Sequence, residues 1–114
     1  MAFIYKICRG AEWDDARRAG IYAGSAGDRR DGFIHFSSAH QLMGTLAKYY
    51  AGANDLMLVA VQQDALGDAL KFEPSRDGAL FPHLYGVLPL SAVAWTKPVV
   101  LQADGQFMLP PECI

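Results

Sequence analysis

Hydrophobic residues recur along the chain in short alternating or unbroken runs, and this pattern predicts several β-strands. In the first run, residues 3–8, odd-numbered and even-numbered side chains are expected on opposite faces, because a strand repeats every two residues. The run Leu56–Val61 is unbroken, which is typical of a strand covered on both faces. Pro98 lies within the strand expected over residues 92–101 and indicates that this strand is at a sheet edge or contains a bulge. Further extended segments are expected at residues 33–36, 70–73, 80–84, 92–101 and 106–109.

Two helices are predicted, both in the first half of the chain. Residues Glu12–Ala19 have acidic residues in the first turn and arginines near the end, which suits the helix dipole, and the glycine that follows is a typical C-terminal cap. Ser38 and Gln41 have the spacing of a capping box for a second helix. Within residues 42–50 the hydrophobic side chains recur on one helical face, and this helix is expected to end at Gly52.

These elements predict an α+β fold in which two helices pack against mostly antiparallel strands. Strands crowd after residue 55 with no helices between them, which argues against a doubly wound parallel sheet. Residues 22–32 contain three glycines and are expected to form a loop. A length of 114 residues with 52% hydrophobic residues predicts a single domain over residues 1–114.

Charge and cysteine content limit the partners and the cellular compartment expected for the protein. The formal net charge of −2 offers no broad basic face for duplex nucleic acid. The two cysteines favour a reducing compartment, Lys6 interrupts the apolar start that a signal peptide would need, and Leu56–Val61 is too short to span a bilayer. We therefore expect a cytoplasmic protein without a membrane partner. His35, His40 and His83 do not have a spacing that requires a metal, so no metal site is expected.

His35 is the first candidate for a functional side chain, because it is a polar residue within the apolar string GFIHFS. Strand alternation places it on the same face as Phe33. Ser37 and Ser38 follow at the start of a helix, where free backbone N–H groups bind phosphate or carboxylate well. The alternative interpretation is a core histidine bonded to a backbone carbonyl, with both serines acting only as caps.

Two later strings carry further candidates. In LFPHLYG, His83 and Tyr85 point to one side of an extended segment and have rings that can stack on a ligand. Alternatively, the loop packs its aromatic residues inward.

In KFEPSRDG, Glu73 could orient a sugar hydroxyl or stabilise a developing cation, and Arg76 could hold a phosphate. The alternative for Glu73 and Arg76 is an exposed ion pair of little energetic value.

The glycine-rich segment GSAGDRRDG, residues 24–32, fits neither the P-loop nor the Rossmann pattern. Arg29 and Arg30 lie just before the strand that contains His35, so they could reach an anionic ligand. The alternative is a solvated turn.

Several strings of this chain resemble those of the bacterial family called domain of unknown function 952. They are IYKI, GFIHFS, TLAKYYAG, DLMLVAV, LKFEPS and LFPHLYG, and the resemblance covers residues 3–101. The fold of that family is similar to that of ADP-ribosyltransferases. The resemblance therefore implies an ADP-ribosylation-like fold, in which two small, mostly antiparallel sheets form a cleft for NAD.

In that superfamily the cleft is lined by a polar residue on the first strand, an aromatic residue or His in a short strand ending in Ser, and often a Glu on a later strand. The matching positions here are Lys6 with Tyr5 beside it, His35 with Ser37 after it, and either Glu73 or His83. We also expect the strings GFIHFS and LFPHLYG to meet in the fold, so that His35, Ser37, His83 and Tyr85 line one pocket.

Two functions follow from the resemblance. As an enzyme, the protein would bind NAD or a related ADP-ribosyl nucleotide and act on its N-glycosidic bond through an oxocarbenium-like state. As a binding module, it would hold a nucleotide or another small anionic ligand without chemistry. Glu73 pointing into the same cleft as His35 would favour the enzyme, and Glu73 facing solvent would favour the binding module. The candidate catalytic residues are His35, Glu73 and His83; Arg29, Arg30 or Arg76 would hold phosphates, and Tyr22 or Tyr85 would stack on the nicotinamide.

Overall fold

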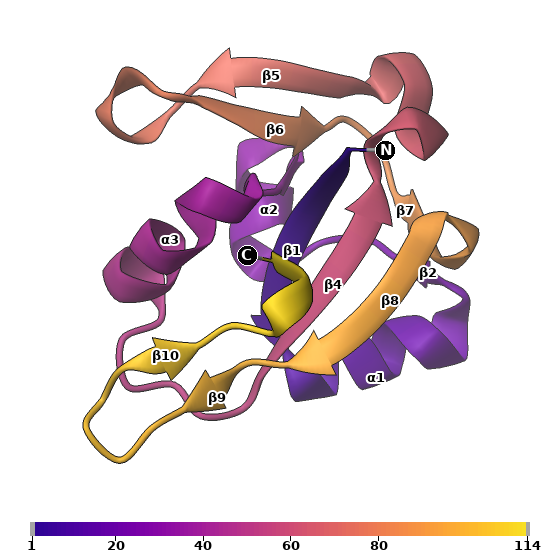
Figure 1. The fold of residues 1–114 in the computed structure, drawn as a ribbon. Helices are drawn as coiled ribbons and strands as arrows, with labels where there is room; N and C mark the ends of the chain where they lie inside the picture. Colours follow the sequence, from indigo (N-terminus) through magenta and orange to yellow (C-terminus); the bar gives the residue numbers. More distant parts are fainter. Residues whose placement is uncertain (1, 114) are drawn as a thin grey trace.

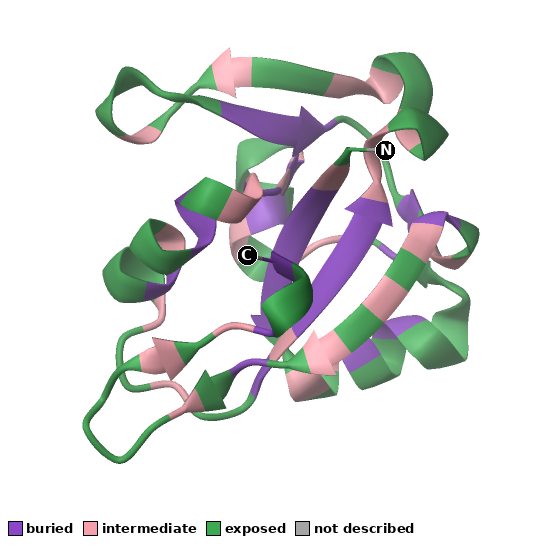
Figure 2. Cartoon of the chain, in the orientation of Figure 1, coloured by how far each residue is buried: buried purple, intermediate pink, exposed green. Residues whose placement is uncertain are grey.

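The largest sheet consists of three antiparallel strands in the order β1-β4-β8. This computed structural model describes residues 2–113. The three strands are β1 (Phe3–Arg9), β4 (Leu56–Gln62) and β8 (Val93–Pro98). The central strand β4 is buried along most of its length, and Figure 2 shows β1 and β4 as the main buried elements of this sheet. Coverage on both faces, expected from the unbroken apolar run, is confirmed.

A second three-stranded sheet has the order β3-β6-β5 and runs across the end of the first sheet where β1 begins and β4 ends (Figure 1). It consists of β3 (Ile34–His35), β6 (Leu80–Leu84) and β5 (Leu70–Pro74), and it pairs His35 with His83. Two further pairs make four sheets within residues 2–113, rather than the two expected. They are β2 (Ile21–Tyr22) with β7 (Leu88–Pro89), and β9 (Val100–Leu101) with β10 (Phe107–Met108).

The strand expected over residues 92–101 is divided in two. A short 3₁₀ turn precedes β8, which ends at Pro98, and β9 begins only at Val100. Proline has no N–H for a further ladder hydrogen bond, and β8 lies at the sheet edge, as Pro98 predicted.

The described residues contain three α-helices rather than two. The expected ones are α1 (Gly10–Ala19) and α3 (Leu42–Tyr49), the latter preceded by a 3₁₀ turn, Ala39–Gln41. The third, α2 (Ala26–Asp31), lies where a loop was predicted. Its start is held by a capping box, in which Ser25 and Asp28 each bond the other's backbone N–H at 3.0–3.1 Å. The prediction of a loop over residues 22–32 is wrong because this local signal outweighs the glycines.

The other connections are short 3₁₀ segments. One of them, Arg76–Gly78, follows β5 and contains Asp77 at φ 57°, a conformation that only Asn, Asp and Gly adopt readily. The remaining ones are Gln63–Ala69, Leu90–Ala92 and Pro111–Cys113.

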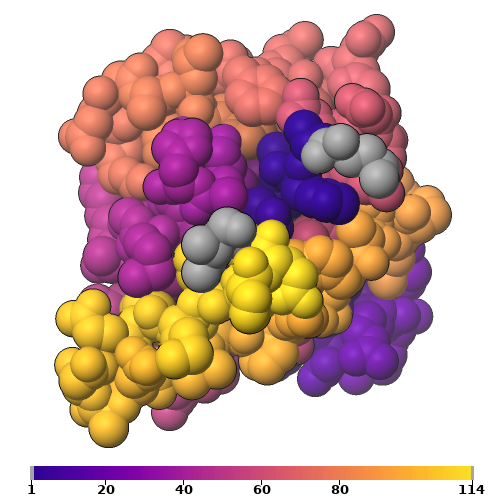
Figure 3. Space-filling view, viewed as in Figure 1, coloured from indigo at the N-terminus to yellow at the C-terminus, as the bar shows by residue number. Residues whose placement is uncertain are grey.

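Hydrophobic side chains pack on both faces of the β1–β4 pair. Ile4 and Cys8 of β1 pack on one side with Trp13 of α1, whereas Tyr5 and Ile7 pack on the other with the α3 side chains. Figure 3 shows the C-terminal segment lying on the surface beside α3 and β8, and its Cys113 belongs to the second cluster. The opposite facing of odd and even residues in β1 is confirmed. Among residues 2–113, no helix combines the length and the apolar composition needed to cross a bilayer.

Candidate functional site

A cavity of about 380 Å³ lies at the free edge of β1, between α2, α3 and the β3–β6 pair. This volume is within the range of small-molecule sites, roughly 300–1,000 Å³. Its wall is rich in charged and hydroxyl groups. The polar side chains along it are Tyr5, Lys6, Ser25, Asp28, Arg30, Asp31, His35, Ser37, Thr45, Tyr49, Tyr50, Ser75, Arg76 and His83.

A buried ion pair forms the floor of this cavity. The Nζ of Lys6 lies 2.7 Å from Oδ2 and 3.0 Å from Oδ1 of Asp28, and both side chains are at most 5% exposed. Burial raises the pKa of Asp28, but the hydrogen bond from His35 and the charge of Lys6 outweigh it and hold that pKa well below its ordinary value. Asp28 is therefore an ionised carboxylate inside the protein.

Two carboxylates hold the ring of His35. Its Nδ1 lies 2.6 Å from Oδ1 of Asp28, and its Nε2 lies 3.0 Å from Oδ2 of Asp31. The backbone N–H of His35 also donates to Asp28, at 3.2 Å. Because the side chain of His35 is 38% exposed and lines the cavity, it is not a core histidine bonded to a backbone carbonyl. Hydrogen bonds from Arg30 and His35 also lower the pKa of Asp31.

Arg76 supplies a cation on the opposite wall. Its Nη1 donates to Oγ1 of Thr45 at 3.1 Å, and its Nη2 donates to the carbonyl of Gln41 at 3.4 Å. The guanidinium carbon lies 4.8 Å from the ring centre of Phe81. No carboxylate among residues 2–113 forms an ion pair with Arg76. The remaining N–H groups of Arg76 are available to an anion. The exposed Glu73–Arg76 ion pair, the alternative considered for these two residues, is not formed.

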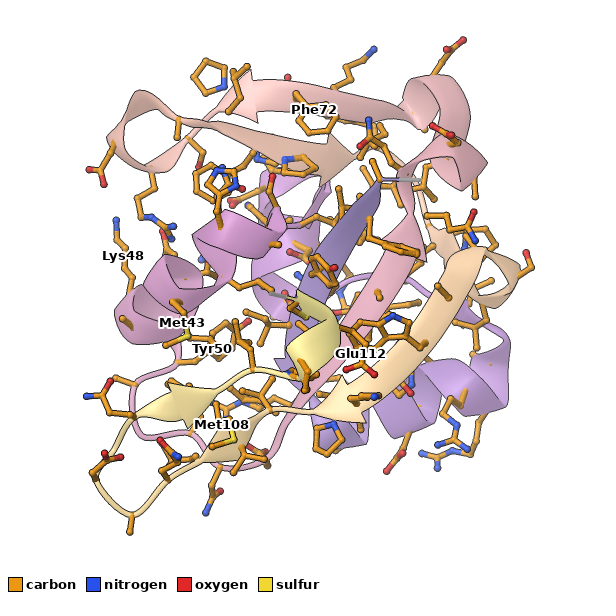
Figure 4. The ribbon with its side chains drawn as sticks, viewed as in Figure 1. Met43, Lys48, Tyr50, Phe72, Met108 and Glu112 are labelled. Carbon is orange, nitrogen blue, oxygen red and sulfur yellow. The ribbon has the colours of Figure 1, made fainter. Side chains whose placement is uncertain are left out.

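The edge of β1 brings backbone groups to the cavity. Tyr5 exchanges two backbone hydrogen bonds with Ser37, at 2.9 and 2.8 Å. Ile7, two residues later, turns its backbone groups toward the same free edge. Its carbonyl accepts a hydrogen bond from the hydroxyl of Tyr50 at 3.3 Å; Figure 4 labels Tyr50 at the end of α3. Burial raises the pKa of Tyr50 to about 12, so this hydroxyl remains a donor.

His83 lies beside His35, with 5.5 Å between the ring centres. This distance meets the expectation that the strings GFIHFS and LFPHLYG come together. The ring of His83 stacks on Phe33 at 4.0 Å, and its Nδ1 lies 2.8 Å from Oε1 of Glu73. The same oxygen accepts from the hydroxyl of Tyr85 at 2.6 Å. The hydrogen bonds from Tyr85 and from His83 lower the pKa of Glu73.

Glu73 and Tyr85 do not line the cavity, contrary to expectation. Glu73 lies on β5, which is separated from β3 by β6, and two donors of the β6 string hold its carboxylate. Glu73 therefore lies behind His83 and does not share the cavity with His35.

Tyr22 and Arg29 also lie outside the cavity. Tyr22 is 3% exposed, its ring packs 6.0 Å from that of Trp13, and burial raises its pKa. Arg29 is exposed and, with Tyr22, lines a separate hollow of about 270 Å³. Arg29 and Arg30 are consecutive in α2, and neighbouring helical residues point in different directions, so only Arg30 faces the cavity.

Sequence reasoning missed Asp28 and Asp31. One signal for Asp28 was present, because Ser25 and Asp28 have the spacing of a capping box, which predicts a helix start at residue 26. Nothing local indicates that Asp28 contacts Lys6, since the two are 22 residues apart.

Solved structures of one bacterial protein are similar to this chain over nearly its whole length. The crystal structure of protein CC0527 from Caulobacter crescentus has a TM-score of 0.92 and 46% sequence identity, and the match covers 97% of each chain. The solution NMR structure of CC0527 has a TM-score of 0.83 and 48% identity, covering 93% of this chain and 91% of that one.

None of the curated proteins matches this chain. The model of a family described as a protein of unknown function, DUF952, matches residues 7–96. This range includes every string that carried the resemblance except IYKI, residues 4–7, of which only Ile7 is matched. The chain therefore belongs to the DUF952 family.

Proposed function

We propose that the protein binds a small anionic ligand in the cavity at the edge of β1, and that this ligand is an ADP-ribosyl nucleotide such as NAD or ADP-ribose. The observation that carries the proposal is Arg76, a guanidinium in the cavity wall without a carboxylate partner among the described residues. Arginine binds phosphate through several N–H groups at once. The choice of an ADP-ribosyl compound follows from the resemblance of the family's fold to ADP-ribosyltransferases.

The other parts of the wall suit the sugar and ring portions of such a ligand. Asp31, which holds Nε2 of His35 and is 35% exposed, lines the cavity and can accept hydrogen bonds from ribose hydroxyls. Tyr49 offers an exposed ring for stacking. Arg30 reaches the cavity from α2, although Asp31 engages its Nε at 3.1 Å.

Of the two functions considered, the geometry favours ligand binding without catalysis. Cleavage of an N-glycosidic bond needs a carboxylate near the developing cation. Glu73 was the residue expected in that role, and its carboxylate is bonded to His83 and Tyr85 outside the cavity. Among residues 2–113, the two carboxylates that do line the cavity are already paired with cations or the His35 ring: Asp28 with Lys6 and His35, and Asp31 with Arg30 and His35. A binding module for the nucleotide is therefore the better proposal.

Thermal unfolding with added ligand tests this function. A ligand that binds only the folded state adds about 2.7 kcal/mol of stability at a hundredfold excess over Kd. ADP-ribose and NAD should raise the melting temperature, and nicotinamide alone, which lacks phosphates, should have little effect. Loss of a charge-assisted hydrogen bond costs about 1.5–3 kcal/mol, so Arg76→Ala should weaken ADP-ribose binding roughly 10- to 150-fold.

Arg29→Ala is the matched control, because it removes an arginine that faces away from the cavity. It should leave the affinity for ADP-ribose unchanged. If millimolar ADP-ribose and NAD leave the melting temperature of the natural protein unchanged, the proposal is wrong.

A further inference from the structure

We propose that His83 is a ligand-contacting residue, whose Nε2 accepts a hydrogen bond from a sugar hydroxyl of the molecule bound in the cavity. This inference rests on the proposed function and gives the ligand a second anchor besides Arg76. The ligand class is then a sugar phosphate or nucleotide, with the phosphate at Arg76 and a hydroxyl at His83.

The first step of the argument is the unpartnered nitrogen. His83 is 3% exposed, and within residues 2–113 its Nε2 is one of only two buried side-chain polar atoms without a hydrogen-bond partner. Leaving such a group unsatisfied is costly, and native proteins do so rarely. The other atom is the hydroxyl of Tyr22, which lies outside the cavity, whereas His83 lines it.

The second step is the protonation pattern of the ring. Nδ1 lies 2.8 Å from a carboxylate oxygen of Glu73, which can only accept, so Nδ1 carries the proton. In a neutral imidazole the other nitrogen then carries a lone pair. Glu73 thus makes Nε2 an acceptor, and Tyr85, which donates to the same oxygen of Glu73, fixes the carboxylate in place.

The third step is position. Stacking on Phe33 holds one face of the ring, and the contact with Glu73 turns the Nδ1 edge away from the cavity, since Glu73 lies outside it. His83 and Phe81 are two residues apart on one face of β6, about 7 Å at the rise of a strand, and Arg76 lies over Phe81. A hydroxyl and a phosphate of one sugar phosphate can therefore reach both residues.

Nε2 of His83 is buried, so a ligand reaches it only after a neighbouring side chain changes its rotamer. Rotamer changes of this kind are common when a ligand binds.

The test uses the full chain and three probes: ADP-ribose, ribose 5-phosphate and inorganic pyrophosphate, which has the anionic groups but no sugar hydroxyl. His83→Phe keeps an aromatic ring against Phe33 and removes Nε2. It should weaken ADP-ribose and ribose 5-phosphate about tenfold or more and leave pyrophosphate binding unchanged, whereas Arg76→Ala should weaken all three. Arg29→Ala is the control, because it removes a side chain outside the cavity, and it should leave the affinities for all three probes unchanged.

Nitrogen NMR of the histidine rings gives a second readout that does not depend on a variant. In the free protein Nε2 of His83 should have the shift of an unprotonated nitrogen, and ADP-ribose should move that signal toward the hydrogen-bonded position. A proton on Nε2, an unmoved signal in the bound protein, or unchanged binding by His83→Phe each overturns the inference while leaving the proposed function intact. If ADP-ribose does not bind, the proposed function fails, and the inference fails with it unless ribose 5-phosphate still moves the Nε2 signal.

Discussion

The guanidinium of Arg76 lies against the backbone of Gly44 in α3. A Cβ at position 44 would meet Nη2 of Arg76 at 3.0 Å and its Cζ at 3.5 Å. The absence of a side chain at Gly44 therefore lets Arg76 lie where it donates to Thr45 and the carbonyl of Gln41.

Gly44→Ala is expected to separate stability from ligand binding. Alanine is favoured over glycine in a helix by about 0.5–1 kcal/mol, and the contact is with the far end of a flexible side chain. The free energy of unfolding should therefore stay equal or rise, while the affinity for ADP-ribose falls because Arg76 is displaced. Urea unfolding and calorimetric titration measure the two effects.

The Arg76→Ala background provides the control for this substitution. There, Gly44→Ala should leave the remaining affinity unchanged, since the two changes act through one side chain. An equal loss of affinity in both backgrounds would mean that Gly44 acts by another route.

Lys6→Met is expected to destabilise the protein by about 3–5 kcal/mol, because removing one partner of a buried ion pair leaves the other charge uncompensated. Asp28 would keep the ring and the backbone N–H of His35 and the backbone N–H of Ser25 as partners. The double variant Lys6→Met, Asp28→Asn should recover part of this loss. Chemical denaturation of the single and double variants checks the coupling, and a loss below about 1 kcal/mol for Lys6→Met would contradict the assignment.

Stability should fall when the pH drops below 3.8, the ordinary pKa of an aspartate. The pKa of Asp28 is lower in the folded than in the unfolded protein, so in that range the unfolded state binds more protons. The contribution of Asp28 is therefore complete above pH 3.8 and is lost as the pH falls through its folded pKa. Unfolding free energies between about pH 2 and pH 6 measure this slope, which should be smaller in Asp28→Asn.

Tyr22→Phe is expected to stabilise the protein by about 1 kcal/mol. The Tyr22 hydroxyl is buried and has no hydrogen-bond partner among the described residues, so its removal relieves a desolvation cost. Because Tyr22 lies outside the cavity, binding of ADP-ribose should not change. A lower melting temperature in the variant would indicate that the hydroxyl has a partner in solution.

Local sequence patterns were sufficient to predict the helices and strands whose hydrophobic residues recur with a regular period. The facing of Tyr5 and Ile7 opposite to Lys6 follows from strand geometry alone, and the burial of Leu56–Val61 follows from its unbroken apolar run. The N–H of Ser38 donates to Oε1 of Gln41 at 2.9 Å, as the capping-box spacing predicted. The approach of His35 to His83 was anticipated from two polar residues in apolar strings, and the pairing of β3 with β6 produces it.

The composition of the candidate site depended on contacts between distant residues. Asp28 becomes a buried carboxylate only because β1 brings Lys6 and β3 brings His35 to α2. Glu73 at a strand end was a candidate acid that could point into the cleft or face solvent, and the register of β5 with β6 places it against His83 and Tyr85. The sequence by itself determined which side chains share a face of each element. Only the tertiary structure decided which faces meet, because strand pairing and helix packing join residues whose separation along the chain carries no local signal.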